Sequence, residues 1–254
     1  MFDLKGKKGL VLGIANADSI AYGCAKAYRR AGADLAVTYL NEKARPHVEP
    51  LAQELSAEIF EPCDVRESGQ LESLFETISR KWGHLDFVLH AIAYAPKEDL
   101  HARVVDCSSK GFLQAMDISC HSFIRLARHA EPLMKQGGCL QTVTFYGSER
   151  VVEEYNLMGP VKAALESSVR YLAAELGGQG IRVHALSPGP LKTRAASGIQ
   201  RFDALLERAR QRAPEHQLVT IDDIGSLSAF LASDSARRIT GNIAYVDAGM
   251  HVME

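Results

Sequence analysis

Short apolar runs alternate with longer amphipathic segments along the whole chain. The runs lack a regular apolar–polar alternation, which is typical of strands buried on both faces of a parallel sheet. They predict strands over residues 10–12, 35–39, 59–60, 87–92, 140–146, 181–186 and 243–246. The amphipathic segments predict helices over residues 20–31, 44–55, 70–81, 112–134 and 158–176, and a further helix near Ile199.

This order of elements predicts a Rossmann-type α/β fold, a doubly wound seven-stranded parallel sheet with helices on both faces. No linker, low-complexity tract or internal repeat interrupts the pattern, so residues 1–254 are expected to form a single domain. Ligands of such sheets bind outside the carboxyl ends of the strands. The chemistry of this chain should therefore lie directly after its strands.

Composition narrows the class of protein. The formal net charge of −2 supports neither a nucleic-acid partner nor an anionic membrane surface. The five cysteines lie far apart without a C-x-x-C pair, so no metal site is predicted, and such spacing is typical of buried, reduced thiols. We see no secretory leader and no apolar run of membrane-spanning length. A cytoplasmic protein is expected.

The segment after the first predicted strand has the features of a phosphate loop. Gly13 would allow the backbone to approach a ligand closely, and the helix after Ser19 offers unpaired N–H groups to a pyrophosphate. Ser19 can cap that helix or donate to a phosphate, and Gly23 would let the helix pack tightly on the sheet. Taken alone, these residues also fit a plain strand–turn–helix connection.

The spacing G-x5-S-I-A-x-G from Gly13 to Gly23 resembles the loop of the bacterial enoyl-acyl-carrier-protein reductases, a divergent branch of the short-chain dehydrogenase/reductase superfamily. The resemblance covers nearly the entire chain. It implies that Asp64 accepts from the adenine amino group, although Asp64 could equally cap the next helix. It also implies that the segment from His90 to Ala95 passes under the nicotinamide ribose, with His90 itself more simply explained as a packed strand residue.

The predicted end of the second strand bears on the choice of cofactor. Residues 39–43 place neither a carboxylate for a ribose 2′-hydroxyl nor an arginine for a 2′-phosphate directly at the strand end. Lys43 and Arg45 come slightly later and could be surface charges. We therefore expect NAD(H), with NADPH as the less favoured cofactor.

The catalytic motif is the most specific part of the resemblance. Ordinary short-chain dehydrogenases carry Y-x-x-x-K, whereas this chain carries Y-x6-K from Tyr155 to Lys162, as the enoyl reductase branch does. The resemblance implies that Lys162 binds the nicotinamide ribose and that Tyr155 donates to the thioester carbonyl. A donor aimed at the developing enolate stabilises the transition state more than the ground state. We expect both side chains on one helix.

Tyr146 resembles the second active-site tyrosine of the family, but the turn after it is one residue shorter than the usual Y-L-G-A-E-R. Counting back from Lys162 by the family interval reaches Phe145. Either the shortening lies in the loop and Tyr146 keeps its place, which we favour, or the phenol is displaced.

The segment from Thr193 towards Ile199 resembles the part of these enzymes that covers the substrate, a mobile lid. Thr193 can bond a cofactor phosphate, and the backbone of Leu191 and Ala195 would flank the nicotinamide. A homotetramer is implied by the resemblance alone. The full set of implied cofactor contacts is Gly13, Ala15, Ser19, Ile20, Leu40, Asp64, Val65, Ile92, Ala93, Lys162, Leu191, Thr193 and Ala195, and the implied substrate contacts are Tyr94, Ala95 and Ala196.

Three functions compete. The first is reduction of trans-2-enoyl thioesters, linked to acyl carrier protein or coenzyme A, by NADH in fatty acid elongation. The second is reduction of another enoyl thioester or a carbonyl by a paralogue. The third is nucleotide sensing without turnover, against which the Tyr155/Lys162 pair argues.

Overall fold

The computed structural model describes residues 3–193 and 201–253. Its seven strands form one parallel sheet in the order β3-β2-β1-β4-β5-β6-β7. The strands are β1 (Lys8–Leu12), β2 (Asp34–Tyr39), β3 (Ile59–Pro62), β4 (Phe87–His90), β5 (Gly138–Val143), β6 (Ile181–Pro188) and β7 (Ile243–Val246). The predicted fold class and all seven predicted strands are confirmed. The order reverses between β1 and β4, which is the switch point where such sheets bind ligands.

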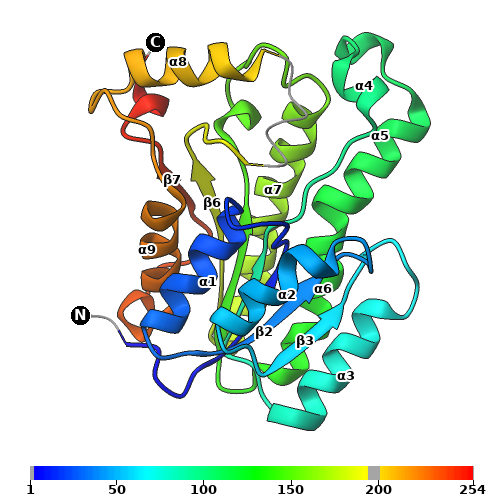
Figure 1. Cartoon of the computed structure of the whole chain (residues 1–254), viewed down its shortest axis with the longest axis vertical. Helices are drawn as coiled ribbons and strands as arrows, with labels where there is room; N and C mark the ends of the chain where they lie inside the picture. Colours follow the sequence, from blue (N-terminus) through cyan, green and yellow to red (C-terminus); the bar gives the residue numbers. More distant parts are fainter. Residues whose placement is uncertain (1–2, 194–200, 254) are drawn as a thin grey trace.

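Helices cover both faces of the sheet (Figure 1). They are α1 (Ile20–Arg30), α2 (Arg45–Glu54), α3 (Gln70–Trp82), α4 (Lys97–His101), α5 (Ser109–Met116), α6 (Ser122–Ala130), α7 (Met158–Leu176), α8 (Phe202–Arg212) and α9 (Ile221–Ala232). Helices α1, α2 and α9 share one apolar core with the sheet, and α3, α6 and α7 share the other. Because side chains alternate along a strand, Leu10 and Leu12 enter one core and Val11 enters the other. That is why the strands are apolar at consecutive positions.

The helix predicted over residues 112–134 is interrupted. Between α5 and α6 lies a π-helical segment, η2 (Asp117–His121). Single π-helical turns inside helices are frequent at functional sites. Here the segment directs Ser119 at the loop after β4, where its hydroxyl accepts from the Tyr94 N–H at 2.9 Å and donates to the Tyr94 carbonyl at 3.0 Å.

Helix α9 was not predicted, although the sequence carries its start signal. Thr220 and Asp223 form a capping box, in which each side chain accepts from the other residue's backbone N–H. The helix also corrects the expected role of Gly23. A Cβ atom at Gly23 would overlap the backbone of Ile221, so this glycine lets α1 approach α9 and not the sheet. Two helices can pack this closely only where a side chain is missing.

Two expectations from composition can be compared with the structure. Cys24, Cys63, Cys120 and Cys139 are buried and Cys107 is partly buried, all as free thiols. Among the described residues, no helix combines the length and the apolar character needed to cross a membrane.

Candidate functional site

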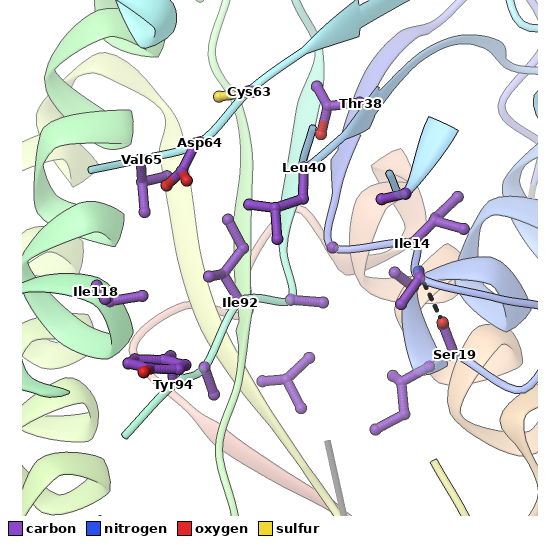
Figure 2. A pocket seen from close by; sticks show the side chains of 18 of the residues that line it. Ile14, Ser19, Thr38, Leu40, Cys63, Asp64, Val65, Ile92, Tyr94 and Ile118 are labelled. Atoms are coloured by element: carbon purple, nitrogen blue, oxygen red, sulfur yellow. Dashed lines mark hydrogen bonds between the residues drawn. The ribbon is translucent and has the colours of Figure 1, made fainter. Parts of the chain in front are cut away.

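A pocket of about 700 Å³ opens at the carboxyl edge of the sheet. It is lined by residues that follow β1, β2, β3 and β4, together with Ile118, Val143, Lys162 and Thr193. Figure 2 shows Asp64 and Val65 on one side of the pocket and Ile14 and Ser19 on the other. The lining includes these predicted cofactor-binding residues: Gly13, Ala15, Ser19, Ile20, Leu40, Asp64, Val65, Ile92, Ala93, Lys162 and Thr193.

Gly13 lies where two strand ends come together. Its φ of 103° is in the region that favours glycine, and a Cβ atom there would overlap the carbonyl oxygen of Ala91. The chain leaving β1 can therefore pass against the chain leaving β4 only because residue 13 has no side chain. This close approach shapes the floor of the pocket.

Ser19 organises the loop and does not cap the helix in the expected way. It occupies the N-cap position of α1, but its hydroxyl accepts from the N–H groups of Ala15 and Asn16, both at 3.0 Å. The bond to Ala15 is the dashed line in Figure 2. The first-turn N–H groups of Ile20 and Ala21 make no hydrogen bond within the described residues. A helix N-terminus with unpaired N–H groups, lining a pocket, is suited to an anion such as a pyrophosphate.

Asp64 is held by a neighbour that the sequence analysis missed. The Arg66 guanidinium donates to its carboxylate from Nε at 3.0 Å and from Nη2 at 2.6 Å, and the backbone N–H of Arg66 donates at 3.0 Å. These hydrogen bonds lower the pKa of Asp64. Helix α3 begins after Gly69 without a side-chain cap, so the alternative role of Asp64 as its cap is wrong.

Two cationic side chains line the pocket near the ends of β2 and β3. These are Lys43 and Arg66, and His47 lines the pocket as well. Arg45, by contrast, pairs with Glu49 at 3.3 Å on the surface of α2. Lys43 therefore belongs to the site, while Arg45 is the surface charge that the sequence allowed.

Lys162 is buried, with 4% of its surface exposed, and it lines the pocket from the second turn of α7. Its ammonium donates to the carbonyl of Val143, the last residue of β5, at 2.6 Å. Burial lowers the pKa of Lys162 to about 8, since water no longer stabilises the charge. The Lys162 side chain is therefore fixed as a hydrogen-bond donor at the edge of the pocket.

Tyr155 does not share a helix with Lys162, which corrects the expected arrangement. Helix α7 begins at Met158, and Tyr155 lies in the turn before it. Glu154 and Asn156 flank it with φ of 64° and 39°, a conformation that non-glycine residues adopt rarely and mostly where surrounding structure requires it. Pro160 falls in the first turn of α7, the one part of a helix that tolerates proline.

Tyr155 is 8% exposed, and burial raises the pKa of its phenol. Its ring packs edge-on against Phe145, with ring centroids 4.9 Å apart. Among the described residues that line the pocket, neither Tyr155 nor Tyr146 is present. Tyr155 lies instead in an apolar cluster with Val152, Met158 and Val161.

The structure shows which of the two neighbouring aromatic residues, Phe145 or Tyr146, packs against the ring of Tyr155, a question that the sequence left open. Phe145 packs edge-on against Tyr155, while Tyr146 packs both against the apolar cluster that contains Tyr155 and against the cluster of Ala209, Ala213 and Met250. Both lie at η4 (Tyr146–Ser148) or directly before it. The ring in direct contact with the ring of Tyr155 is therefore that of Phe145, which carries no hydroxyl, and Tyr146 is its neighbour, with ring centroids 4.7 Å apart.

The remaining predicted residues are placed as follows. Tyr94 lines the pocket, whereas Ala95 packs against the apolar cluster that contains Tyr155. Leu191 packs against the core beneath α1. Ala195, Ala196 and the lid up to Ile199 lie outside the described residues.

His90 is a packed strand residue, as expected. It is fully buried, with its ring nitrogens bonded to the hydroxyls of Ser122 at 2.7 Å and Thr142 at 3.2 Å. Burial lowers its pKa to about 3, so the ring is neutral.

Several lining residues were missed by the sequence analysis: Thr38, Asn41, Arg66, Ile118 and Val143. Arg66 carried a signal, because it follows the Asp64-Val65 pair directly. Ile118 carried no such sequence signal, because its place in the pocket lining depends on the π-helical segment η2.

Comparisons with known proteins agree with this geometry. A model of the family described as enoyl-(acyl carrier protein) reductase matches residues 13–251. The chain is 45% identical over 250 residues to the NADH-dependent enoyl-[acyl-carrier-protein] reductase 1 of Rhizobium meliloti, covering 98% of this chain and 92% of that one. A solved reductase of Anaplasma phagocytophilum in complex with NAD is 45% identical, with a TM-score of 0.95 over 100% of this chain and 97% of that one. The Bacillus cereus reductase with NADP+ and an indole naphthyridinone is 42% identical, with a TM-score of 0.97 over 100% of both chains.

Proposed function

Because the chain belongs to the enoyl-(acyl carrier protein) reductase family, we propose that it reduces the carbon–carbon double bond of trans-2-enoyl thioesters with NADH, in fatty acid elongation. The observation that carries the proposal is the pocket at the carboxyl edge of the sheet, which has Lys162 in its wall and Tyr155 in the adjoining turn. The substrate is the thioester of acyl carrier protein, as the names of the relatives indicate.

The residues of the pocket fit a dinucleotide. The space left by the missing side chain of Gly13 and the unpaired N–H groups of Ile20 and Ala21 would hold the pyrophosphate. Asp64 and Val65 would hold the adenine, and the segment from Ile92 to Tyr94 would lie along the nicotinamide ribose. Leu191 and Ala195 would flank the nicotinamide, and Thr193 would contact a phosphate. NADH is the cofactor named for the curated relatives, and it is the one we assign.

A bound dihydronicotinamide would supply the hydride for the β-carbon of the double bond, and the resulting enolate would take a proton from solvent at its α-carbon. Tyr155 would donate a hydrogen bond to the thioester carbonyl, on which negative charge develops. Lys162 would bind the ribose hydroxyls and add positive charge near the same centre. Since both donors are fixed before the reaction, little reorganisation is needed in the transition state.

The acyl chain needs an apolar surface next to Tyr155. Tyr94, Ala95 and Ala196 are assigned to the substrate, and Ala95 already packs against the apolar cluster around Tyr155. Tyr146 was expected to be a second catalytic phenol; we assign the catalytic donation to Tyr155 because Phe145, and not Tyr146, is the ring that packs against the ring of Tyr155.

Asp64→Asn tests the adenine contact. Loss of the charged acceptor is expected to weaken NADH binding about tenfold, the value of one charge-assisted hydrogen bond. The measurement is NADH affinity by fluorescence titration. Asp34→Asn is the matched control, since Asp34 pairs with Lys8 at the opposite edge of the sheet. If Asp64→Asn and Asp34→Asn changed the NADH affinity equally, Asp64 would not contact the nucleotide.

The activity itself is tested by following NADH oxidation with crotonyl thioesters of acyl carrier protein and of coenzyme A, and with ketones. Turnover on the enoyl thioesters and not on ketones is the expected result. Turnover on ketones alone would indicate a paralogous carbonyl reductase. Nucleotide binding without turnover on any substrate would indicate a sensor.

We also assign the enzyme to the cytoplasm and expect it to act as a homotetramer. Sedimentation velocity measures the assembly directly.

A further inference from the structure

Glu166 is a buried carboxyl group that the proposed chemistry does not use. It lies on α7 one helical turn after Lys162, with only 2% of its surface exposed. Acidic side chains are almost never buried to this extent without partners. Its contacts lie next to the catalytic residues.

The carboxylate ties three elements together. Its Oε1 atom accepts hydrogen bonds from Thr144 Oγ1 at 2.6 Å and from Ser148 Oγ at 2.5 Å. Thr144 directly follows Val143, whose carbonyl accepts from Lys162. Ser148 ends η4, the turn that also contains Tyr146. One oxygen atom therefore joins the end of β5 and the turn to the helix that carries Lys162.

We propose, on the basis of the proposed function, that Glu166 is a positioning residue of the active site, which keeps Lys162 in its hydrogen-bond-donating form by holding a negative charge one helical turn away from it on α7. The hydrogen bonds from Thr144 and Ser148 hold that charge in place. A clamp that worked through the hydrogen bonds alone would not need a charged group at this position.

The charges around the two donors support this role. Burial lowers the pKa of Lys162 to about 8, and the negative charge of Glu166 opposes that shift. Burial raises the pKa of the Tyr155 phenol, and Glu166 raises it further. Glu166 thus favours the protonated form of each.

No other group facing these side chains supplies the same charge within the described residues. Cys120 of η2 and His90 of β4 both interact with Lys162, but burial keeps the thiol protonated and the imidazole neutral. Tyr245 of β7 also interacts with Glu166, and its pKa is raised to about 12 by burial and by its hydrogen bond to Glu149. Glu149 is the second acid in this region, and it interacts with Tyr245.

The test compares three variants. Glu166→Gln retains an acceptor oxygen for Thr144 and Ser148 but removes the charge. Ser148→Ala is the matched control, because it removes one hydrogen bond and leaves the charge. Glu166→Asp keeps the charge on a shorter side chain and should restore the wild-type behaviour in part.

The main readout is the affinity for NADH as a function of pH, by fluorescence titration. In the wild type, affinity should fall as pH rises through the pKa of Lys162, because the lysine loses its proton. In Glu166→Gln that fall should begin about one pH unit lower, the size expected for the loss of an opposite charge nearby. Ser148→Ala should leave the midpoint in place. An unmoved midpoint in Glu166→Gln would overturn the proposal, as would an equal movement in Ser148→Ala.

A second readout does not depend on the proposed reaction. The titration of Lys162 can be followed in nucleotide-free protein by NMR of carbon-labelled lysine, with the signal assigned from its loss in Lys162→Met. A lower midpoint in Glu166→Gln supports the proposal even if the protein reduces no enoyl thioester. Failure of turnover in the wild type would count against the proposed function alone.

Discussion

The Tyr155→Phe variant is expected to lose about 10²–10³-fold in kcat on an enoyl thioester, the usual cost of removing one donor to a developing oxyanion. NADH affinity should stay unchanged, because Tyr155 is not among the described residues that line the cofactor pocket. The ring itself can remain in place, since Phe retains the packing against Phe145 and Met158. The substitution should therefore lower kcat and leave the melting temperature unchanged. Steady-state kinetics together with a thermal melt measure both.

Tyr146→Phe is the matched control for that loss. It removes the hydroxyl of the residue next to Phe145, and it is the ring of Phe145 that makes the edge contact with Tyr155. We expect a change in kcat of less than about threefold, well below the cost of losing an oxyanion donor. If Tyr146→Phe instead cost as much as Tyr155→Phe, Tyr146 would be the second phenol of the site, as its position in the sequence first suggested.

The Gly13→Ala variant is expected to weaken NADH binding about 100-fold. The new methyl group would overlap the Ala91 carbonyl oxygen, and the residue would have to keep a φ of 103°. Overpacking of this kind costs about 1–3 kcal/mol and the strained backbone about as much again, so the loop should move away from its position against β4. Because that loop precedes the N-terminus of α1, its displacement removes the pyrophosphate site.

Gly69→Ala separates the cost of backbone strain from the cost of the steric overlap. Gly69 has a similar φ of 85°, but no atom lies within 4 Å of the position that its Cβ would take. This variant should lose some stability from backbone strain alone and bind NADH as the wild type does. Fluorescence titration and denaturant unfolding of both variants are the measurements. Normal NADH binding by Gly13→Ala would show that the close approach of the two strand ends is not needed for the site.

The strands and their parallel arrangement were accessible from the sequence because they depend on local patterns. Consecutive apolar residues such as Leu10 to Leu12 indicate burial on both faces, and alternation with amphipathic segments indicates parallel pairing. The loop from Gly13 to Ser19 could be located for the same reason, since its glycine and its helix start are local signals. These features require few contacts with distant parts of the chain.

The arrangement of the site depended on contacts between distant residues, which local patterns do not encode. The spacing of Tyr155 and Lys162 predicted one shared helix, yet the turn with positive φ at Glu154 and Asn156 ends the helical geometry before Met158. Gly23 was identified as a point of close packing, but its partner is a helix about two hundred residues away in sequence.

The sequence by itself determined the seven strands and their parallel arrangement, and it located the glycine-containing loop after β1, because periodicity and motif spacing are properties of neighbouring residues. Only the tertiary structure decided which aromatic ring stands beside Tyr155, that Arg66 holds Asp64, and that Glu166 is buried one helical turn from Lys162. Each of these depends on a change of direction in the backbone or on the packing of separate elements. Burial then sets the protonation of the groups that meet there.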